Sequence, residues 1–248
     1  MVTTYFEEQT AKNSALYIKQ FSERRSLILN SMESMHTYRE EFNWILGNTY
    51  LSNLGPAETP IFSALIKNEF ALYSCLRLTD LGLYGSARTL LRSVFEALMI
   101  AKFASVSQSE EFIEKWTSGQ IIYFSKAILK KIENPRLDEI GSLWGLLCEF
   151  SHATIYAQQV ELDFENIEKE ISINYSLIMI FLCWSHHLLN RHFVTSSMEY
   201  YTSRYRQDSD LKSIKATAKE SIGLIKKPLT KSSKKAIREY VAAWELRF

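Results

Sequence analysis

Glycine and proline are scarce in this chain, and their scarcity restricts the possible folds more than any motif does. The 248 residues include 8 glycines and 4 prolines, well below the roughly 7% and 5% of an average protein. Long segments without these residues favour helices over many short strands. Because 46% of the residues are hydrophobic, the chain can also bury a substantial core. We therefore predict an all-α fold, a multi-helix bundle.

A central helical hairpin is the expected framework of this bundle. Residues 61–80 carry a wide apolar face at helical spacing, and a second, largely apolar helix is expected to end near Ser105. Gly82 and Gly85 are expected to supply the turn between the two helices, with Ser86 as the N-cap of the second one.

The segment at residues 53–60 is the clearest loop, because it holds one glycine and two prolines. It divides a single domain into an N-terminal helical arm, residues 1–52, and a helical bundle with basic C-terminal helices, residues 61–248. The arm has an amphipathic pattern that fits one long helix or two. An exposed amphipathic arm needs a surface to cover its apolar side, so we predict a homodimer.

Three further helices are predicted between the hairpin and the C-terminal region. Ser107 and Glu110 have the spacing of a capping box, which predicts a helix from there to Pro135. A short helix is expected over residues 137–154, and a central core helix over residues 171–195. The apolar run at 177–184 is shorter than the roughly 20 residues of a membrane span, so no membrane contact is predicted.

Cysteine usage predicts a reducing compartment. Cys75, Cys148 and Cys183 lie far apart inside apolar runs, which is typical of reduced core thiols and not of disulfides or zinc ligands. The first residues lack the pattern of a signal peptide. We therefore expect a cytoplasmic protein.

Charge is distributed unevenly along the chain. Residues 201–248 contain 12 Lys and Arg against 5 Asp and Glu, a net charge of +7, whereas residues 1–200 carry a net charge of −6. The basic region could contact nucleic acid or an acidic partner. The alternative is a solvated helix face, since no aromatic pattern is interleaved with the lysines.

The second helix of the hairpin contains the most distinctive chemistry. Arg88, Arg92 and Glu96 recur every fourth residue in an otherwise apolar segment and are expected to form one polar stripe. One interpretation is a structural network, with Arg92 paired to Glu96, and Arg88 paired to Asp80 or Glu69 across the hairpin. The other is that both guanidinium groups bind a phosphate or carboxylate.

The histidines are the remaining candidates for chemistry. His152 lies three residues after Glu149 on the same predicted helix face and could act as an acid or base, or merely cap the helix. His186, His187 and His192 do not share one helix face, so no metal site is predicted. Phosphate loops, nucleophile elbows and paired-cysteine motifs do not occur in the sequence, and no cofactor is expected.

The segment from Leu83 to Ala97, followed by the Ser151-His152 pair, resembles a family of bacterial helical proteins of unknown function. Those proteins share a helix of the form small-x-Ala-Arg-x-x-x-Arg-x-x-x-Glu and a later Ser-His. The resemblance covers roughly residues 60–160 and implies a helical bundle.

More distantly, that bundle is similar to the HEPN domains of toxin and phage-defence ribonucleases. In HEPN domains an arginine and a histidine four to six residues later form a composite site across a dimer. This chain has no arginine followed by histidine at that distance; His187 and Arg191 have the reverse order. The resemblance implies that a ribonuclease site would use Arg88, Arg92, Glu96 and His152.

Two classes of function follow from the sequence. The first is a non-enzymatic interaction or sensor module, in a bacterial defence or stress system, whose polar stripe stabilises the core or binds an anionic ligand. The second is a HEPN-like, metal-independent ribonuclease that acts on RNA through the arginines and His152. The second class requires Arg88, Arg92, Glu149 and His152 to meet in a water-accessible cleft.

Overall fold

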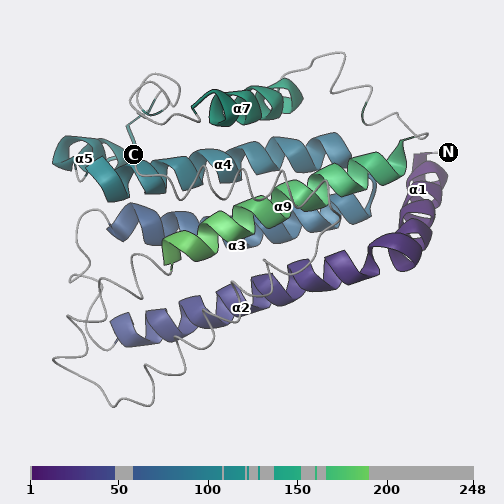
Figure 1. Cartoon of the computed structure of the whole chain (residues 1–248), viewed down its shortest axis with the longest axis horizontal. Coiled ribbons are helices and arrows are strands. Elements are labelled where there is room, and N and C mark those ends of the chain that lie inside the picture. Colours follow the sequence, from purple (N-terminus) through teal and green to yellow (C-terminus); the bar gives the residue numbers. More distant parts are fainter. Residues whose placement is uncertain are drawn as a thin grey trace.

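Helices are the regular secondary structure in the described part of the chain. A computed structural model describes residues 2–47, 58–107, 109–120, 122, 128, 137–151, 160 and 166–189, and its regular elements there are helices without any strand. Figure 1 shows long helices packed side by side in a bundle. The predicted all-α fold built on a helical hairpin is confirmed.

The hairpin consists of α3 (Glu58–Asp80) and α4 (Tyr84–Ser107). Gly82 forms the turn alone: its φ of +82° is easily adopted only by glycine, and its N–H donates to Thr79 O at 3.1 Å. The Leu83 N–H donates to Leu78 O at 2.9 Å, which completes a Schellman motif. Gly85 and Ser86 were predicted as turn and N-cap, but both lie inside α4, which begins at Tyr84.

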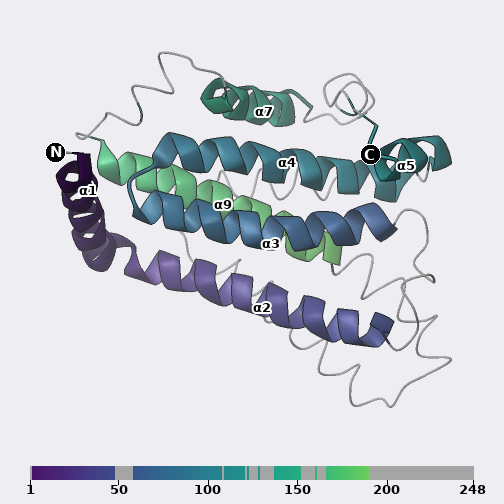
Figure 2. The same ribbon diagram turned by 180° about the vertical axis from the view of Figure 1, so that it is seen from behind.

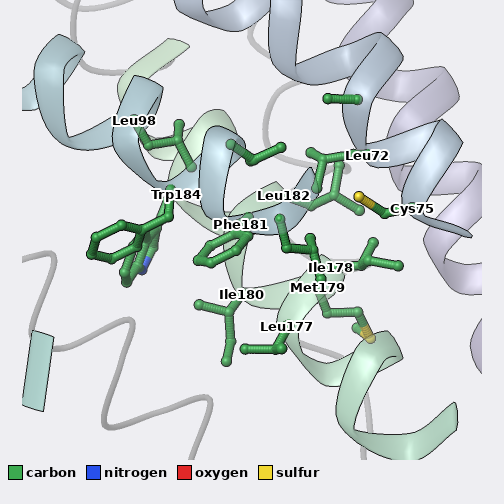
Figure 3. Packing of buried hydrophobic residues seen from close by; sticks show 14 of the residues in the cluster. Leu72, Cys75, Leu98, Leu177, Ile178, Met179, Ile180, Phe181, Leu182 and Trp184 are labelled. Atoms are coloured by element: carbon green, nitrogen blue, oxygen red, sulfur yellow. The ribbon is translucent and has the colours of Figure 1, made fainter. Parts of the chain in front are cut away.

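Helix α9 (Ile167–Leu189) crosses the hairpin and forms the centre of the core. Figure 3 shows its apolar side chains packed against Leu72 and Cys75 of α3 and Leu98 of α4. By length and composition alone α9 could cross a membrane, but 78% of its most apolar window is buried inside the bundle. That degree of burial is typical of a core helix.

The N-terminal arm is made of α1 (Val2–Leu16), a π-helical turn (Tyr17–Phe21) and α2 (Ser22–Gly47). The arm changes direction at the π-helical turn, so α1 points away from the line of α2 (Figures 1 and 2). Phe21, Ile28, Met32 and Met35 of the arm are buried in the common core. The body of the protein therefore covers the apolar side that led us to expect a dimer, and the dimer stays a prediction.

Helix α5 (Glu110–Thr117) differs from its prediction at both ends. Its N-cap is Ser109, whose hydroxyl accepts the Phe112 N–H at 3.3 Å, and not Ser107. It ends at a second Schellman motif around Gly119, whose φ is +75°, long before the expected end at Pro135.

The other boundaries differ by a few residues. Helix α7 (Leu137–Ser151) and α9 both occur where helices were expected. Helix α3 begins at Glu58, three residues earlier than predicted, because Pro60 is tolerated in a first helical turn. The predicted loop before Glu58, the residue His152 and the basic C-terminal helices lie outside the described residues.

Candidate functional site

The polar stripe on α4 faces two different helices. Arg88 points to α9, whereas Arg92 and Glu96 contact α7. A helix has 3.6 residues per turn, so each step of four residues rotates the side chain by about 40° around the axis. That rotation separates one charge pattern in the sequence into an interior part and a surface part.

Arg88 is sealed in the interior. Its side chain is 2% exposed, and its Nε donates to Asn174 Oδ1 at 2.7 Å. Its Nη2 donates to the carboxylate of Glu170, which is also buried. The guanidinium carbon lies 4.7 Å from the centre of the Phe150 ring, in a cation–π contact. Protein groups therefore occupy the Nε and Nη2 donors and one face of this cation.

The amide of Asn174 extends this interior network to the hairpin. Its Nδ2 donates to Thr79 Oγ1 at 3.1 Å and to the backbone carbonyl of Tyr84 at 3.2 Å. Thr79 in turn donates to Cys75 O at 2.8 Å. Because each of these buried polar groups has a partner, the network joins α9 to both arms of the hairpin without an orphaned charge.

Arg92 and Glu96 form the surface part of the stripe, and their predicted pairing is confirmed. Arg92 Nε donates to Glu96 Oε1 at 3.0 Å, with side chains 27% and 30% exposed. Arg92 Nη1 donates to Ser151 Oγ of α7 at 2.5 Å, and Trp144 Nε1 donates to the same Glu96 oxygen at 3.4 Å. Within the described residues, Arg92 Nη2 makes no hydrogen bond.

The predicted partners of Arg88, Asp80 and Glu69, were wrong, because both carboxylates pair with arginines of the N-terminal arm. Asp80 accepts from Arg25 Nε at 2.8 Å and from the Tyr175 hydroxyl at 2.8 Å. Burial, together with the charge and hydrogen bond of Asp80, raises the pKa of Tyr175. The phenol therefore stays protonated and donates to Asp80.

Glu69 was the second expected partner of Arg88, but it also faces the arm. It accepts from Arg39 Nε at 2.7 Å, and its other oxygen lies 2.5 Å from His36 Nδ1. Arg39 is itself buried, with its pKa lowered by burial but raised overall by the hydrogen bond and charge of Glu69. This carboxylate therefore attaches α2 to α3.

The predicted pair of Glu149 and His152 is only partly described. Glu149 is exposed on α7, and His152 lies outside the described residues. Ser151, the residue before His152, is the one that Arg92 contacts. The structure thus brings Arg92 to Ser151 and keeps Arg88 away from solvent.

Arg92 and Glu96, with Trp144, Cys148 and Ser151 of α7, form a surface cluster. Cys148 was not predicted as a site residue from the sequence. It is half-buried on α7, and Arg92 and Glu96 lie close enough to affect its thiol. Burial raises its pKa, the charge of Arg92 opposes that shift, and Glu96 adds to it. The thiol is therefore protonated at neutral pH and is a weak nucleophile.

A sequence signal for this cluster does exist. Trp144, Cys148 and Ser151 recur at spacings of four and three, so they share one side of α7. The predicted core position holds for Cys75 and Cys183, which are buried, whereas Cys148 is only partly buried. All three are free thiols.

His186 lies in the core between α9 and α2. Its Nε2 is 3.1 Å from Ser31 O and donates to it, and burial lowers its pKa to about 4 despite that hydrogen bond. His187 is only partly buried, and His192 lies outside the described residues. Among the residues that the structure describes, no group of three potential ligands could hold a metal ion.

Comparison with protein-family models, curated proteins and solved structures finds no match to this chain. What it does must therefore be argued from the geometry of its own side chains.

Proposed function

We propose that this protein is a non-enzymatic helical interaction module, in which Arg88 holds α9 against the hairpin. The burial of Arg88 carries the proposal. An arginine that stabilises charge on a reacting phosphate must touch the substrate, but Arg88 is 2% exposed and contacts Glu170, Asn174 and Phe150. Its role is to neutralise the buried Glu170 and to join α9 to the hairpin through hydrogen bonds in the core.

Arg92 is the cation that we propose for contact with an anionic group. Its side chain is 27% exposed, and Nη2 has no partner among the described residues. A guanidinium edge can hold one phosphate or carboxylate oxygen. The carboxylate of Glu96 already accepts from Nε of the same guanidinium at 3.0 Å, so its negative charge opposes tight binding of a second anion.

A second candidate function, the metal-independent ribonuclease, is favoured by one contact. Arg92 Nη1 reaches Ser151 Oγ at 2.5 Å, and His152 is the next residue. In this alternative Arg92 would stabilise the phosphate charge and His152 would transfer the proton. The exposed Glu149 would stand on the same helix.

An RNA cleavage assay separates the two functions. Single-stranded RNA is incubated with excess wild-type protein and with the Arg92→Ala, His152→Ala and Lys19→Ala variants. Lys19 is a matched control because it is an exposed cation on the arm. The interaction module predicts intact RNA in every sample. Cleavage by wild type and Lys19→Ala that both other variants abolish would overturn it.

A further inference from the structure

The outer side of α3 presents one continuous stripe of exposed side chains. From residue 67 to the turn after the helix, the exposed residues are Lys67, Phe70, Tyr73, Ser74, Arg77 and Leu81. Their spacings of three and four place them on one side of the helix. We call these six residues the α3 ridge; at 1.5 Å per residue it is about 21 Å long.

Packing leaves only this side of α3 open within the described structure. Helices α4, α9 and α2 contact its other sides. In Figure 2, α3 lies between α4 and α2 with α9 behind it. The side chains of α3 that are buried, among them Leu72 and Cys75, are offset from the α3 ridge and face the core.

Large aromatic surface is exposed on the α3 ridge. Phe70 is 67% exposed and Tyr73 is 51% exposed. They are one helical turn apart, so they form a single apolar patch. Burial of these rings by a partner would be favourable, and neighbouring exposed aromatics of this kind mark interaction surfaces.

The charge of the α3 ridge has one sign. Lys67 and Arg77 are its charged members, and none of the six residues is acidic. The nearby carboxylates of α3 face the arm instead, where Arg39 holds Glu69 and Arg25 holds Asp80. Arg77 approaches Asp80 only at 3.9 Å with its side chain 52% exposed, so the ridge keeps its positive charge.

We propose that the α3 ridge is a docking surface for an acidic amphipathic helix of another protein. The proposal rests on the interaction function above and names its surface and its partner. Apolar residues of the partner helix would cover Phe70 and Tyr73, and flanking carboxylates would meet Lys67 and Arg77. Recognition of this kind uses anchors spaced by three, four and seven residues, which is the spacing of the α3 ridge.

Charge complementarity selects this occupant over others. A second copy docked antiparallel about the Phe70 and Tyr73 pair would bring Lys67 close to the partner copy's Arg77. The C-terminal region of the same chain carries a net charge of +7 over residues 201–248 and would be repelled as well. RNA is disfavoured because two cations along about 21 Å of helix are too few to follow a phosphate backbone.

Fluorescence anisotropy with defined probes tests the proposal. The probes are an 18-residue amphipathic peptide with leucine on one side and glutamate on the other, its lysine counterpart, and a single-stranded RNA of 12 nucleotides. Full-length wild type is expected to bind the glutamate peptide most tightly. The Phe70→Ser/Tyr73→Ser variant should bind it at least about tenfold more weakly. The Lys67→Glu/Arg77→Glu variant should prefer the lysine peptide.

A matched control and a mapping experiment complete the test. Ile18 is 70% exposed but lies on the arm, so Ile18→Ser should bind like wild type. In the wild-type protein, the glutamate peptide should shift the amide NMR signals of residues 67–81. This second readout does not depend on the folding of any variant.

Several results would overturn the proposal. They are no binding of the glutamate peptide, equal binding by all variants, tighter binding of RNA, or a dimer in sedimentation that Phe70→Ser dissociates. Failure of the interaction function looks different: RNA would be cleaved in an Arg92-dependent way while peptide binding to the α3 ridge persisted.

Discussion

Arg88 and Arg92 lie one turn apart on the same helix, yet they belong to different environments. Arg88 is 2% exposed and pairs with the buried Glu170, whereas Arg92 is 27% exposed and pairs with Glu96 at the surface. A buried charge pair is costly to break because removal of one partner leaves the other unpaired in the core. A surface pair contributes little, since water replaces either partner. A charge motif read along a helix can therefore combine a structural half with an accessible half.

The largest expected effect is the loss of the buried cation. Arg88→Met should lower the free energy of unfolding by about 3–5 kcal/mol, because Glu170 would be left buried without its partner. Arg92→Met, the matched change one turn on, should cost less than about 1 kcal/mol. Urea denaturation followed by circular dichroism measures both. Equal losses would remove the distinction between the two environments.

His186 of α9 should also make the free energy of unfolding sensitive to acid. His186 has a pKa of about 4 in the folded protein and about 6.5 when unfolded, so the unfolded chain takes up the proton first. The stability of the folded protein with neutral His186 is therefore at its full value above pH 6.5, and it falls as the pH is lowered towards 4. Between pH 7 and pH 5 the loss should be about 2 kcal/mol.

His186→Gln tests this pH dependence because it keeps a donor near Ser31 O without a titrating ring. Its free energy of unfolding should vary less between pH 7 and pH 5 than that of wild type. His36→Gln is the control, because His36 is exposed and its replacement leaves the buried His186 in place. An unchanged pH profile in His186→Gln would contradict the assignment.

The smallest effect is expected at the α7 side, in the reactivity of Cys148. Glu96 raises the pKa of this thiol and Arg92 lowers it. At pH 7.5, Glu96→Gln should therefore speed alkylation by iodoacetamide about two- to fivefold, and Arg92→Met should slow it. Mass spectrometry of the labelled peptide gives the rates. Identical rates in all three proteins would place Cys148 outside the cluster.

The sequence predicted those parts of the fold that depend on local spacing. The rarity of glycine and proline and the three-four periodicity indicated each described helix of the bundle, and Gly82 marked the hairpin turn. Gly85 and Ser86 misled the prediction because both lie inside α4, where Gly85 is buried and Ser86 is exposed.

The site was less predictable because its contacts join distant segments. Arg92 and Glu96 are one turn apart, so their pairing could be inferred. Arg88 and Glu170 are 82 residues apart, and Glu170 lies in the first turn of α9, where an acid is expected in any solvated helix. Nothing local distinguishes Glu170 from such an acid. Only the packing of α9 across the hairpin makes it the partner of Arg88.

A double-mutant cycle on Arg88 and Glu170 tests the central claim most directly. If the pair is a sealed structural element, Arg88→Met alone should cost about 3–5 kcal/mol in urea denaturation. Adding Glu170→Leu should then recover most of that loss, because no buried charge remains unpaired. Wild-type stability in Arg88→Met would contradict the account, because a guanidinium that can be removed without cost is not the partner of a buried carboxylate.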